Sequence, residues 1–175
     1  YRLESKINSV YSLMDLSYKN YLFLQLTGRN DWSSTLPVDN NSYFYPSASL
    51  SFAFTEAFNM SSTENWLDFG KIRLAYAGSA SGTDPYQTST IFGSGVFGGA
   101  VTRYIPGTLP TEFLKPQRSK SLEIGTQLSF LKSRLSLDFS YYNIKSSDQI
   151  LQGQVSVASG VNTVTINTGE LQNQG

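Results

Sequence analysis

Apolar and polar residues alternate with a period of two along most of the chain. In residues 22–27, leucine occupies every second position, and Phe, Gln and Thr occupy the positions between. Such alternation is typical of a β-strand, because successive side chains of a strand point to opposite faces. The same pattern recurs in residues 10–18, 47–54, 71–76, 121–130 and 135–142, and a weaker strand is expected to begin near Val164. The chain is therefore predicted to be all-β, with about seven antiparallel strands.

The turns between neighbouring strands are consistent with this assignment. Antiparallel neighbours must place their apolar side chains on the same side of the sheet. A pairing of Leu16 with Leu24 needs an odd number of turn residues, which residues 19–21 supply. The hairpin around residues 131–134 needs an even number for the same reason. Both hairpins are therefore expected to keep one apolar face.

Short and long connections alternate along the chain. The shorter ones are residues 19–21, 131–134 and 55–66, and the long ones are residues 30–45, about 79–119 and about 145–163. In the connection 55–66, a helical turn is expected, with Ser61 and Glu64 spaced as a weak capping box. Short turns at one end and long loops at the other are typical of an outer-membrane barrel, whose tilted strands of about 9–11 residues cross the bilayer. A soluble antiparallel sandwich shows the same alternation and stays open as the alternative.

The two faces of the predicted sheet differ in polarity. A barrel in the outer membrane places apolar residues toward lipid and polar residues toward the lumen. The residues expected to face lipid are Leu22, Leu24, Leu26, Leu50, Phe52, Leu74, Ile124, Leu128, Leu137 and Phe139. The residues expected on the lumen side of the wall are Gln25, Arg29, Lys71, Arg73, Glu123 and Asp138. Lys71 and Arg73 are expected to pair with Asp138 and Glu123 across the wall, or to pack against whatever fills the barrel.

Aromatic residues near the predicted strand ends agree with a barrel, because aromatic girdles lie at both membrane interfaces. These residues are Tyr18, Tyr21, Trp66, Phe69 and Tyr141.

The composition lacks the residues that several common catalytic and metal sites need. The 175 residues contain no cysteine and no histidine, which excludes disulfides, Ser-His-Asp triads and the common zinc sites. Lys+Arg and Asp+Glu are equal at 13 each, and no basic cluster suggests a nucleic-acid partner. We expect no metal site, no cofactor and no enzymatic role, since carboxylates such as Glu112 and Glu123 have no evident catalytic partner. The first residue is Tyr1, and we expect the chain to be a piece of a longer protein.

Two short motifs match functional patterns without the context that those functions require. Residues 93–98, "GSGVFG", match G-x-G-x-x-G, but a dinucleotide site needs that motif between a strand and a helix. We expect a flexible loop or lid contact there instead. Residues 39–42, "DNNS", offer oxygen ligands for calcium but lack the EF-hand spacing, so an Asx-type turn is expected.

Long segments of the chain resemble a known family. The stretch "YKNYLFLQLTGRNDWSSTLP", followed by "SYFYPSASLSFAFTEAF", closely resembles the barrel of SusC/RagA-type TonB-dependent outer-membrane transporters. Other segments are similar to later parts of the same barrel, namely "LDFGKIRLAYAGSASGTDPYQ", "LKPQRSKSLEIGTQLSFLKSRLSLDFSYYN" and "SSDQILQGQVSVASG". The resemblance runs in family order along nearly the whole chain.

This resemblance implies a fold, a location and a function. It implies a barrel of about 22 strands in the bacterial outer membrane, plugged by an N-terminal domain. This chain would supply about seven strands, without the plug or the segment that contacts TonB. The family imports oligosaccharides or peptides, energised through TonB, usually beneath a SusD-like surface lipoprotein. The expected partners are thus that lipoprotein, the TonB complex through other parts of the protein, and outer-membrane lipid.

Six residues in or beside the long loops are expected to contact the substrate or the lid. They are Trp32, Tyr43, Tyr45, Asp84, Tyr86 and Tyr104. Trp32 has two interpretations: an aromatic surface near the substrate cavity, or a loop anchor with a buried indole.

Two other functions stay open at this point. The first is a receptor for a siderophore or another metal chelate on the same barrel architecture. The second is a soluble β-sandwich binding module, which would bury the leucine faces against another sheet.

Overall fold

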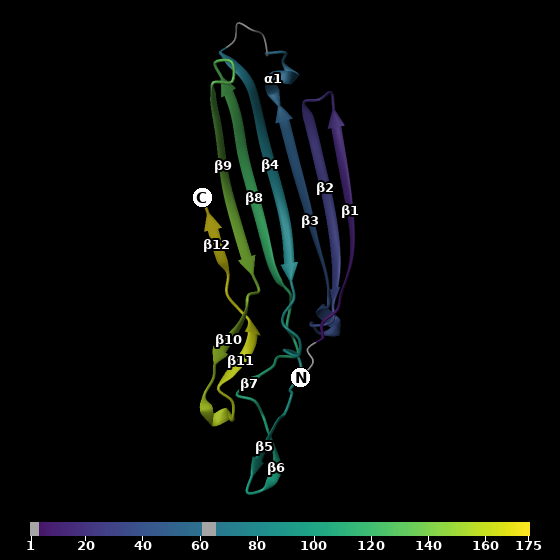
Figure 1. The fold of residues 1–175 in the computed structure, drawn as a ribbon, viewed down its shortest axis with the longest axis vertical. Helices are drawn as coiled ribbons and strands as arrows, with labels where there is room; N and C mark the ends of the chain where they lie inside the picture. Colours follow the sequence, from purple (N-terminus) through teal and green to yellow (C-terminus); the bar gives the residue numbers. More distant parts are fainter. Residues whose placement is uncertain (1–3, 61–65) are drawn as a thin grey trace.

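The computed structural model describes residues 4–60 and 66–175, and it consists mainly of one antiparallel sheet of seven strands (Figure 1). In spatial order the strands are β1 (Ile7–Tyr18), β2 (Leu22–Ser33), β3 (Ser42–Ala53), β4 (Leu67–Ser81), β8 (Gln117–Phe130), β9 (Leu135–Ser147) and β12 (Leu171–Gln174). Each strand of this sheet pairs with the next one along the chain once the loop strands are set aside, so the sheet is an up-and-down meander.

The connections at one end of the sheet are compact and those at the other end are large (Figure 1). The compact end holds the β1–β2 and β8–β9 turns and the helical turn α1 (Phe54–Ala57), which confirms the expected helical turn. The expected capping box of Ser61 and Glu64 lies outside the described residues. The large end, hereafter the loop end, holds the remaining elements: the 3₁₀ turns η1 (Val38–Asn40) and η2 (Val157–Ser159), and the strands β5 (Gly93–Phe97), β6 (Ala100–Tyr104), β7 (Thr108–Leu109), β10 (Ile150–Gln154) and β11 (Thr163–Asn167).

The strand register confirms the two predicted hairpins. Leu16 lies opposite Leu24 in the first hairpin, and Leu128 lies opposite Leu137 in the second. The alignment continues across the sheet, so one apolar row runs from β1 to β9 through Leu16, Leu24, Leu50, Leu74, Ile124 and Tyr141. We call this side of the sheet the apolar face and the opposite side the polar face. All ten residues predicted to face lipid belong to the apolar face, and all six predicted wall residues belong to the polar face.

Several predicted boundaries were wrong. The residues near Val164 form β11, which pairs with β10 in the loops, and the seventh strand of the main sheet is β12. The connection predicted at residues 30–45 is shorter, because β2 continues to Ser33 and β3 begins at Ser42. Tyr141 lies opposite Ile124 inside the sheet rather than at a strand end. In each case the ends of the paired strands differ from the ends of the hydrophobic alternation.

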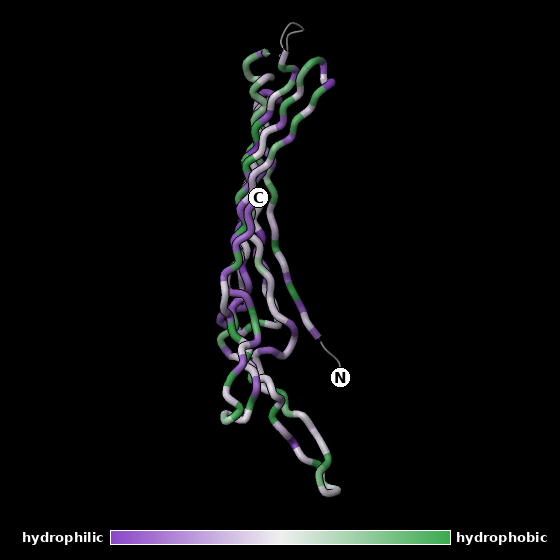
Figure 2. Tube along the Cα trace, turned by 90° about the vertical axis from the view of Figure 1, so that its left-hand side faces the viewer, coloured by the Kyte–Doolittle hydropathy of each residue, from purple (hydrophilic) through white to green (hydrophobic). Residues whose placement is uncertain are grey.

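The sheet is a single layer whose apolar face carries no packed partner among the described residues (Figure 2). Ile124 and Leu137 are 48% and 52% exposed, values far from those of a folded core. The sandwich alternative required a second sheet on this face, so the structure does not support it. The buried core lies instead at the loop end, where Leu36, Tyr43 and Leu114 contact one another.

The loop elements form two small sheets. β10, β11 and β7 make a three-stranded sheet, and β5 and β6 make a separate hairpin that projects farthest from the barrel strands (Figure 1). The turn of that hairpin is Gly98-Gly99, both at positive φ, as a two-residue type I′ turn requires. The G-x-G-x-x-G match therefore forms a β-hairpin. The 39–42 motif lies across the end of η1 and the first residue of β3. Within the described residues, no helix is long and apolar enough to cross a membrane.

Candidate functional site

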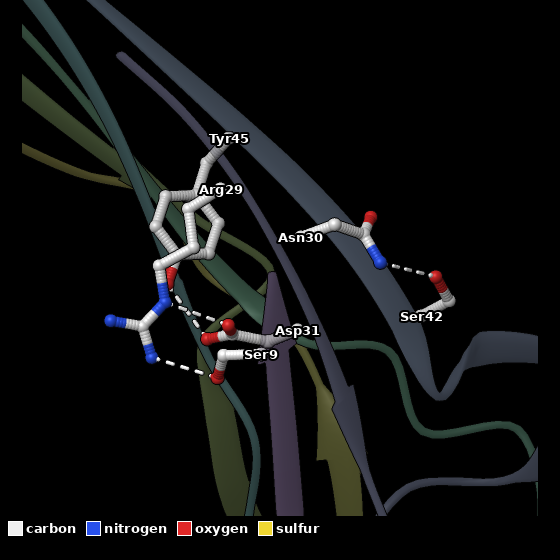
Figure 3. Close-up of polar contacts among 6 residues, drawn as sticks. All are labelled: Ser9, Arg29, Asn30, Asp31, Ser42 and Tyr45. Atoms are coloured by element: carbon white, nitrogen blue, oxygen red, sulfur yellow. Dashed lines mark hydrogen bonds and ion pairs between the residues drawn. The ribbon is translucent and has the colours of Figure 1, made fainter. Parts of the chain in front are cut away.

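A cluster of polar side chains lies on the polar face where β1, β2 and β3 approach the loop end (Figure 3). Asp31 is its centre and is only 4% exposed. Its Oδ1 accepts a hydrogen bond from Arg29 Nε at 2.7 Å, and its Oδ2 accepts one from the Tyr45 hydroxyl at 2.7 Å. Arg29 Nη2 also donates to Ser9 Oγ at 3.0 Å. The Asp31–Arg29 pair of β2 therefore joins β3 through Tyr45 and β1 through Ser9.

The alternation of side chains along each strand explains why this cluster forms on one face of the sheet. Arg29 and Asp31 are two residues apart on β2, so both belong to the polar face, and Asn30 between them bonds Ser42 on the opposite side (Figure 3). A buried carboxylate is costly unless hydrogen bonds and a counter-charge satisfy it. Arg29 and Tyr45 together provide both. The cluster is thus a structural support directly beneath the loops.

A second ion pair crosses the polar face nearer the middle of the sheet. Arg73 on β4 donates from Nη2 to Asp138 Oδ1 on β9 at 2.6 Å, which spans the intervening strand β8. The residue beneath the guanidinium is Gly125, where a Cβ atom would lie 3.1 Å from Arg73 Nη2 and 2.9 Å from Ser140 Oγ. The glycine leaves room for the arginine to cross. The expected wall pairing of Arg73 with Asp138 is therefore present.

A cavity of about 480 Å³ opens above the Asp31 cluster at the loop end, and we call it the mouth pocket. Ser33 and Thr35 form one wall, and their hydroxyls are 2.8 Å apart. The segment after β4, with Asp84, forms another wall. The β10 strand and Thr165 of β11 close the third side. The lining combines hydroxyls, amides and a few aliphatic side chains.

Close backbone approach brings two of these walls together. A Cβ atom on Gly82 would lie 3.0 Å from Thr35 Oγ1 and 3.3 Å from Ser33 Oγ. The absence of a side chain lets the segment after β4 pack directly on the end of β2. Gly82 therefore sets the width of the mouth pocket on that side.

The six predicted contact residues do not form one site. Asp84 lines the mouth pocket, and Tyr86 lines a neighbouring cavity of about 220 Å³. Tyr104 lies on the projecting hairpin, where its ring covers Gly93. Tyr43 and Tyr45 belong to β3 and not to a loop, and their rings stack with centroids 6.2 Å apart.

Trp32 differs most from expectation. It belongs to β2 and lies on the apolar face, opposite to Asp31, with 41% of its surface exposed. The interpretation as a buried loop anchor is therefore wrong for the isolated chain. Its position on the apolar face also separates it from the mouth pocket.

Sequence reasoning missed the residues that shape the site. The sequence predicts Asp31 within the long connection 30–45, although the spacing Arg29-x-Asp31 within a continuing strand would place both on one face. Gln87 and Gln152, which line the mouth pocket, carry no signal in the sequence because they converge only through the fold of the loops. Over residues 4–60 and 66–175, no group of three or more acidic side chains could hold a metal ion.

Comparison with known proteins decides the family. The model of the TonB-dependent receptor-like β-barrel matches residues 1–175, which is the whole chain. The chain belongs to that family. TonB-dependent receptors are outer-membrane transporters of Gram-negative bacteria rather than enzymes, so this TonB-dependent receptor segment is part of an outer-membrane barrel.

Two curated relatives are similar along the chain. TonB-dependent receptor P3 of Formosa agariphila is 29% identical over 180 residues, covering 100% of this chain, and receptor P26 of the same organism is 28% identical over 176 residues, covering 97%. The chain spans 18% of the length of each of these relatives.

Solved structures share the fold of this TonB-dependent receptor segment. The RagAB peptide importer in its closed-closed state matches with a TM-score of 0.86 at 20% identity, covering 96% of this chain and 18% of that one. The siderophore receptor PirA of Pseudomonas aeruginosa matches with a TM-score of 0.64 at 14% identity, covering 98% and 30%. The siderophore receptor PirA of Acinetobacter baumannii matches with a TM-score of 0.67 at 19% identity, covering 99% of this chain and 25% of that one.

Proposed function

We propose that this chain forms a wall and loop segment of an active importer of oligosaccharides or peptides. The apolar face meets outer-membrane lipid, the polar face lines the lumen, and the loop end faces the outside of the cell. The segment carries out no bond chemistry. It encloses the path of the substrate and shapes its entrance.

The placement of aromatic side chains supports this orientation in the membrane. Trp32 and Phe44 lie on the apolar face near the loop end, and both are exposed. At the opposite end, Trp66 stacks on Phe130 with centroids 5.3 Å apart. From Leu22 to Trp32 the strand rises about 33 Å, which a tilt of roughly 40° reduces to about 25 Å, the height of the apolar band of an outer-membrane barrel. Trp32 therefore acts as part of an interfacial girdle.

The agreement with the peptide importer supports the proposed cargo class. Matches to RagAB reach TM-scores of 0.86 and 0.87, whereas the siderophore receptors reach 0.64 and 0.67 at similar coverage of this chain. This difference is the observation that carries the proposal, together with the SusC/RagA-like segments of the sequence. By the same likeness, a SusD-like lipoprotein would cover the loop end, and energy would come through TonB from parts of the protein outside this chain.

The mouth pocket supports an entrance at the loop end. Ser33 and Gln117, which contribute to its lining, lie on the polar face at the ends of β2 and β8, and Thr35 follows two residues after β2. The pocket therefore opens where the lumen meets the loops. Its volume of about 480 Å³ lies within the range of about 300–1,000 Å³ that is usual for ligand sites.

The test is to purify the full-length protein with an affinity tag from outer membranes in detergent. Mass spectrometry then identifies its stoichiometric partner and any bound small molecules. A co-purifying surface lipoprotein with a bound oligosaccharide or peptide is the expected result. A ferric chelate as the bound molecule, without a lipoprotein, would instead establish the siderophore alternative.

A further inference from the structure

Two cavities at the loop end adjoin one another. The mouth pocket and the smaller cavity of about 220 Å³ share Gln87 and Gln152 in their linings. Asp84 lies in the first cavity and Tyr86 in the second, both on the segment that follows β4. The shape is therefore that of an elongated site with two different ends, which suits a linear ligand.

The charge in the described lining of this double site is negative. Asp84 is the only Asp, Glu, Lys or Arg in the described lining of either cavity. It is exposed to solvent and receives no side-chain hydrogen bond or ion pair from the part of the chain that the structure describes. In the lining that the described residues supply, an anionic ligand would meet a carboxylate and no cation. A ligand with an ammonium group at one end would meet the Asp84 carboxylate.

The junction between the cavities offers amide groups. Gln87 accepts a hydrogen bond from Thr165 through Oε1 at 3.4 Å, which leaves its NH₂ group free to donate to a ligand. Within residues 4–60 and 66–175, the side-chain amide of Gln152 has no hydrogen-bond partner. A primary amide carries both donors and an acceptor, which matches the alternating N–H and C=O groups of an extended main chain.

The far end of the site holds a strained tyrosine. Tyr86 adopts φ 65°, in the left-handed region that a bulky residue rarely occupies. Such strain persists where the surrounding structure imposes it, and it is often found at ligand sites. Tyr86 is 46% exposed and lines the smaller cavity, so it presents an aromatic surface to whatever lies beyond the amides.

We propose that this double site binds the amino-terminal end of an extended peptide. Asp84 receives the terminal ammonium, Gln87 and Gln152 bond the first main-chain amides, and a following side chain packs on Tyr86. The inference rests on the proposed importer function and narrows its cargo to peptides with a free amino end. A neutral oligosaccharide would use the hydroxyls and amides equally well but has no group that pairs with Asp84.

The experiment measures ligand binding to the full-length protein by calorimetry in detergent. The probe is a mixture of short peptides of Ala, Ser, Thr and Tyr with amidated carboxyl ends, prepared with a free and with an acetylated amino terminus. Neutral oligosaccharides of similar size and a ferric chelate are measured in parallel. The variants are D84N and Q152L, and D39N is the control, because Asp39 is an exposed loop carboxylate that lines neither cavity.

We expect acetylation to weaken binding to the unmodified protein by about two- to fivefold, the size of a solvent-exposed ion pair. In D84N the two forms of the peptide bind equally, Q152L weakens both forms, and D39N changes neither. Equal binding of the free and acetylated peptides by the unmodified protein would overturn the inference and leave the importer function standing. Binding of oligosaccharides alone would do the same, whereas binding of the ferric chelate alone would refute the importer function itself.

Discussion

At the scale of single residues, the Tyr45 hydroxyl is a sensitive test of the Asp31 cluster. Tyr45→Phe removes one of the two hydrogen bonds to a buried carboxylate and keeps the aromatic stack with Tyr43. We expect the free energy of unfolding to fall by about 1–2 kcal/mol, because the lost hydrogen bond has a charged acceptor. Urea unfolding of the full-length protein in lipid vesicles measures it.

The matched control is Tyr43→Phe in the same stacked pair. Across the described part of the chain, the Tyr43 hydroxyl donates no hydrogen bond, so its removal should change the unfolding free energy by less than about 0.5 kcal/mol. Equal effects of the two substitutions would mean that the Asp31–Tyr45 contact contributes nothing.

The Arg73–Asp138 pair should contribute less than the Asp31 cluster. Its side chains are 34% and 51% exposed in the isolated chain, so solvent screens the attraction. A double-mutant cycle with Arg73→Gln and Asp138→Asn should give a coupling energy of about 0.2–1 kcal/mol. A coupling well above that range in the full-length protein would indicate that another domain fills the lumen and removes water from the pair.

At the scale of the strand, the assignment of faces can be tested with two adjacent positions of β2. Leu26 lies on the apolar face, and Gln25 lies on the polar face, where it donates to Asp15 at 2.9 Å. Leu26→Arg should destabilise the folded barrel in lipid vesicles by about 2–4 kcal/mol, because the charge enters the hydrocarbon. Gln25→Arg places the same charge beside Asp15 in the lumen and should have little effect. The reverse order would invert the faces of the sheet.

The register of the strands is the part of the fold that the sequence predicts best. Alternation excludes every register shifted by an odd number of residues, because such a shift would place the leucines of β2 on the face opposite to Leu50 and Leu74. The same argument puts the six wall residues together on the polar face, as the register shows, and their contact with the lumen stays a prediction. Hydrophobic alternation is therefore enough to assign the two faces of a strand wherever one face is uniformly apolar.

The strand ends and the mouth pocket could not be predicted in the same way. Near the loop end, β2 and β3 continue through Asp31 and Tyr45. The Asp31 carboxylate is satisfied there by Arg29 and by the Tyr45 hydroxyl, an arrangement that hydrophobic alternation does not reveal. The mouth pocket is assembled from residues as distant as Thr35, Asp84 and Gln152. The packing of Leu36 and Leu114 beneath the loops helps to bring these segments together, and periodicity carries no information about such contacts.

At the scale of the whole molecule, the loops divide into a supported part and a projecting part. β10 lines the mouth pocket and packs its Ile150 against the core of Leu36, Tyr43 and Leu114. The β5–β6 hairpin pairs only with itself among the described strands, and its tip exposes Phe97 at 81%. Removal of the supported part and removal of the projecting part should therefore have different effects on cargo binding and stability.

Replacement of residues 93–104 by a short Gly/Ser linker should leave folding in lipid vesicles and binding of cargo unchanged. β4 and β8 pair directly down to Ser81 and Gln117, so the barrel wall does not depend on the hairpin, and a shorter loop changes the closure entropy by only about 0.6 kcal/mol per halving of its length. The same replacement of residues 150–167 removes a wall of the mouth pocket and uncovers Leu36 and Leu114. That variant should lose cargo binding and unfold at a lower urea concentration. Loss of cargo binding in the first variant would instead assign the recognition surface to the projecting hairpin.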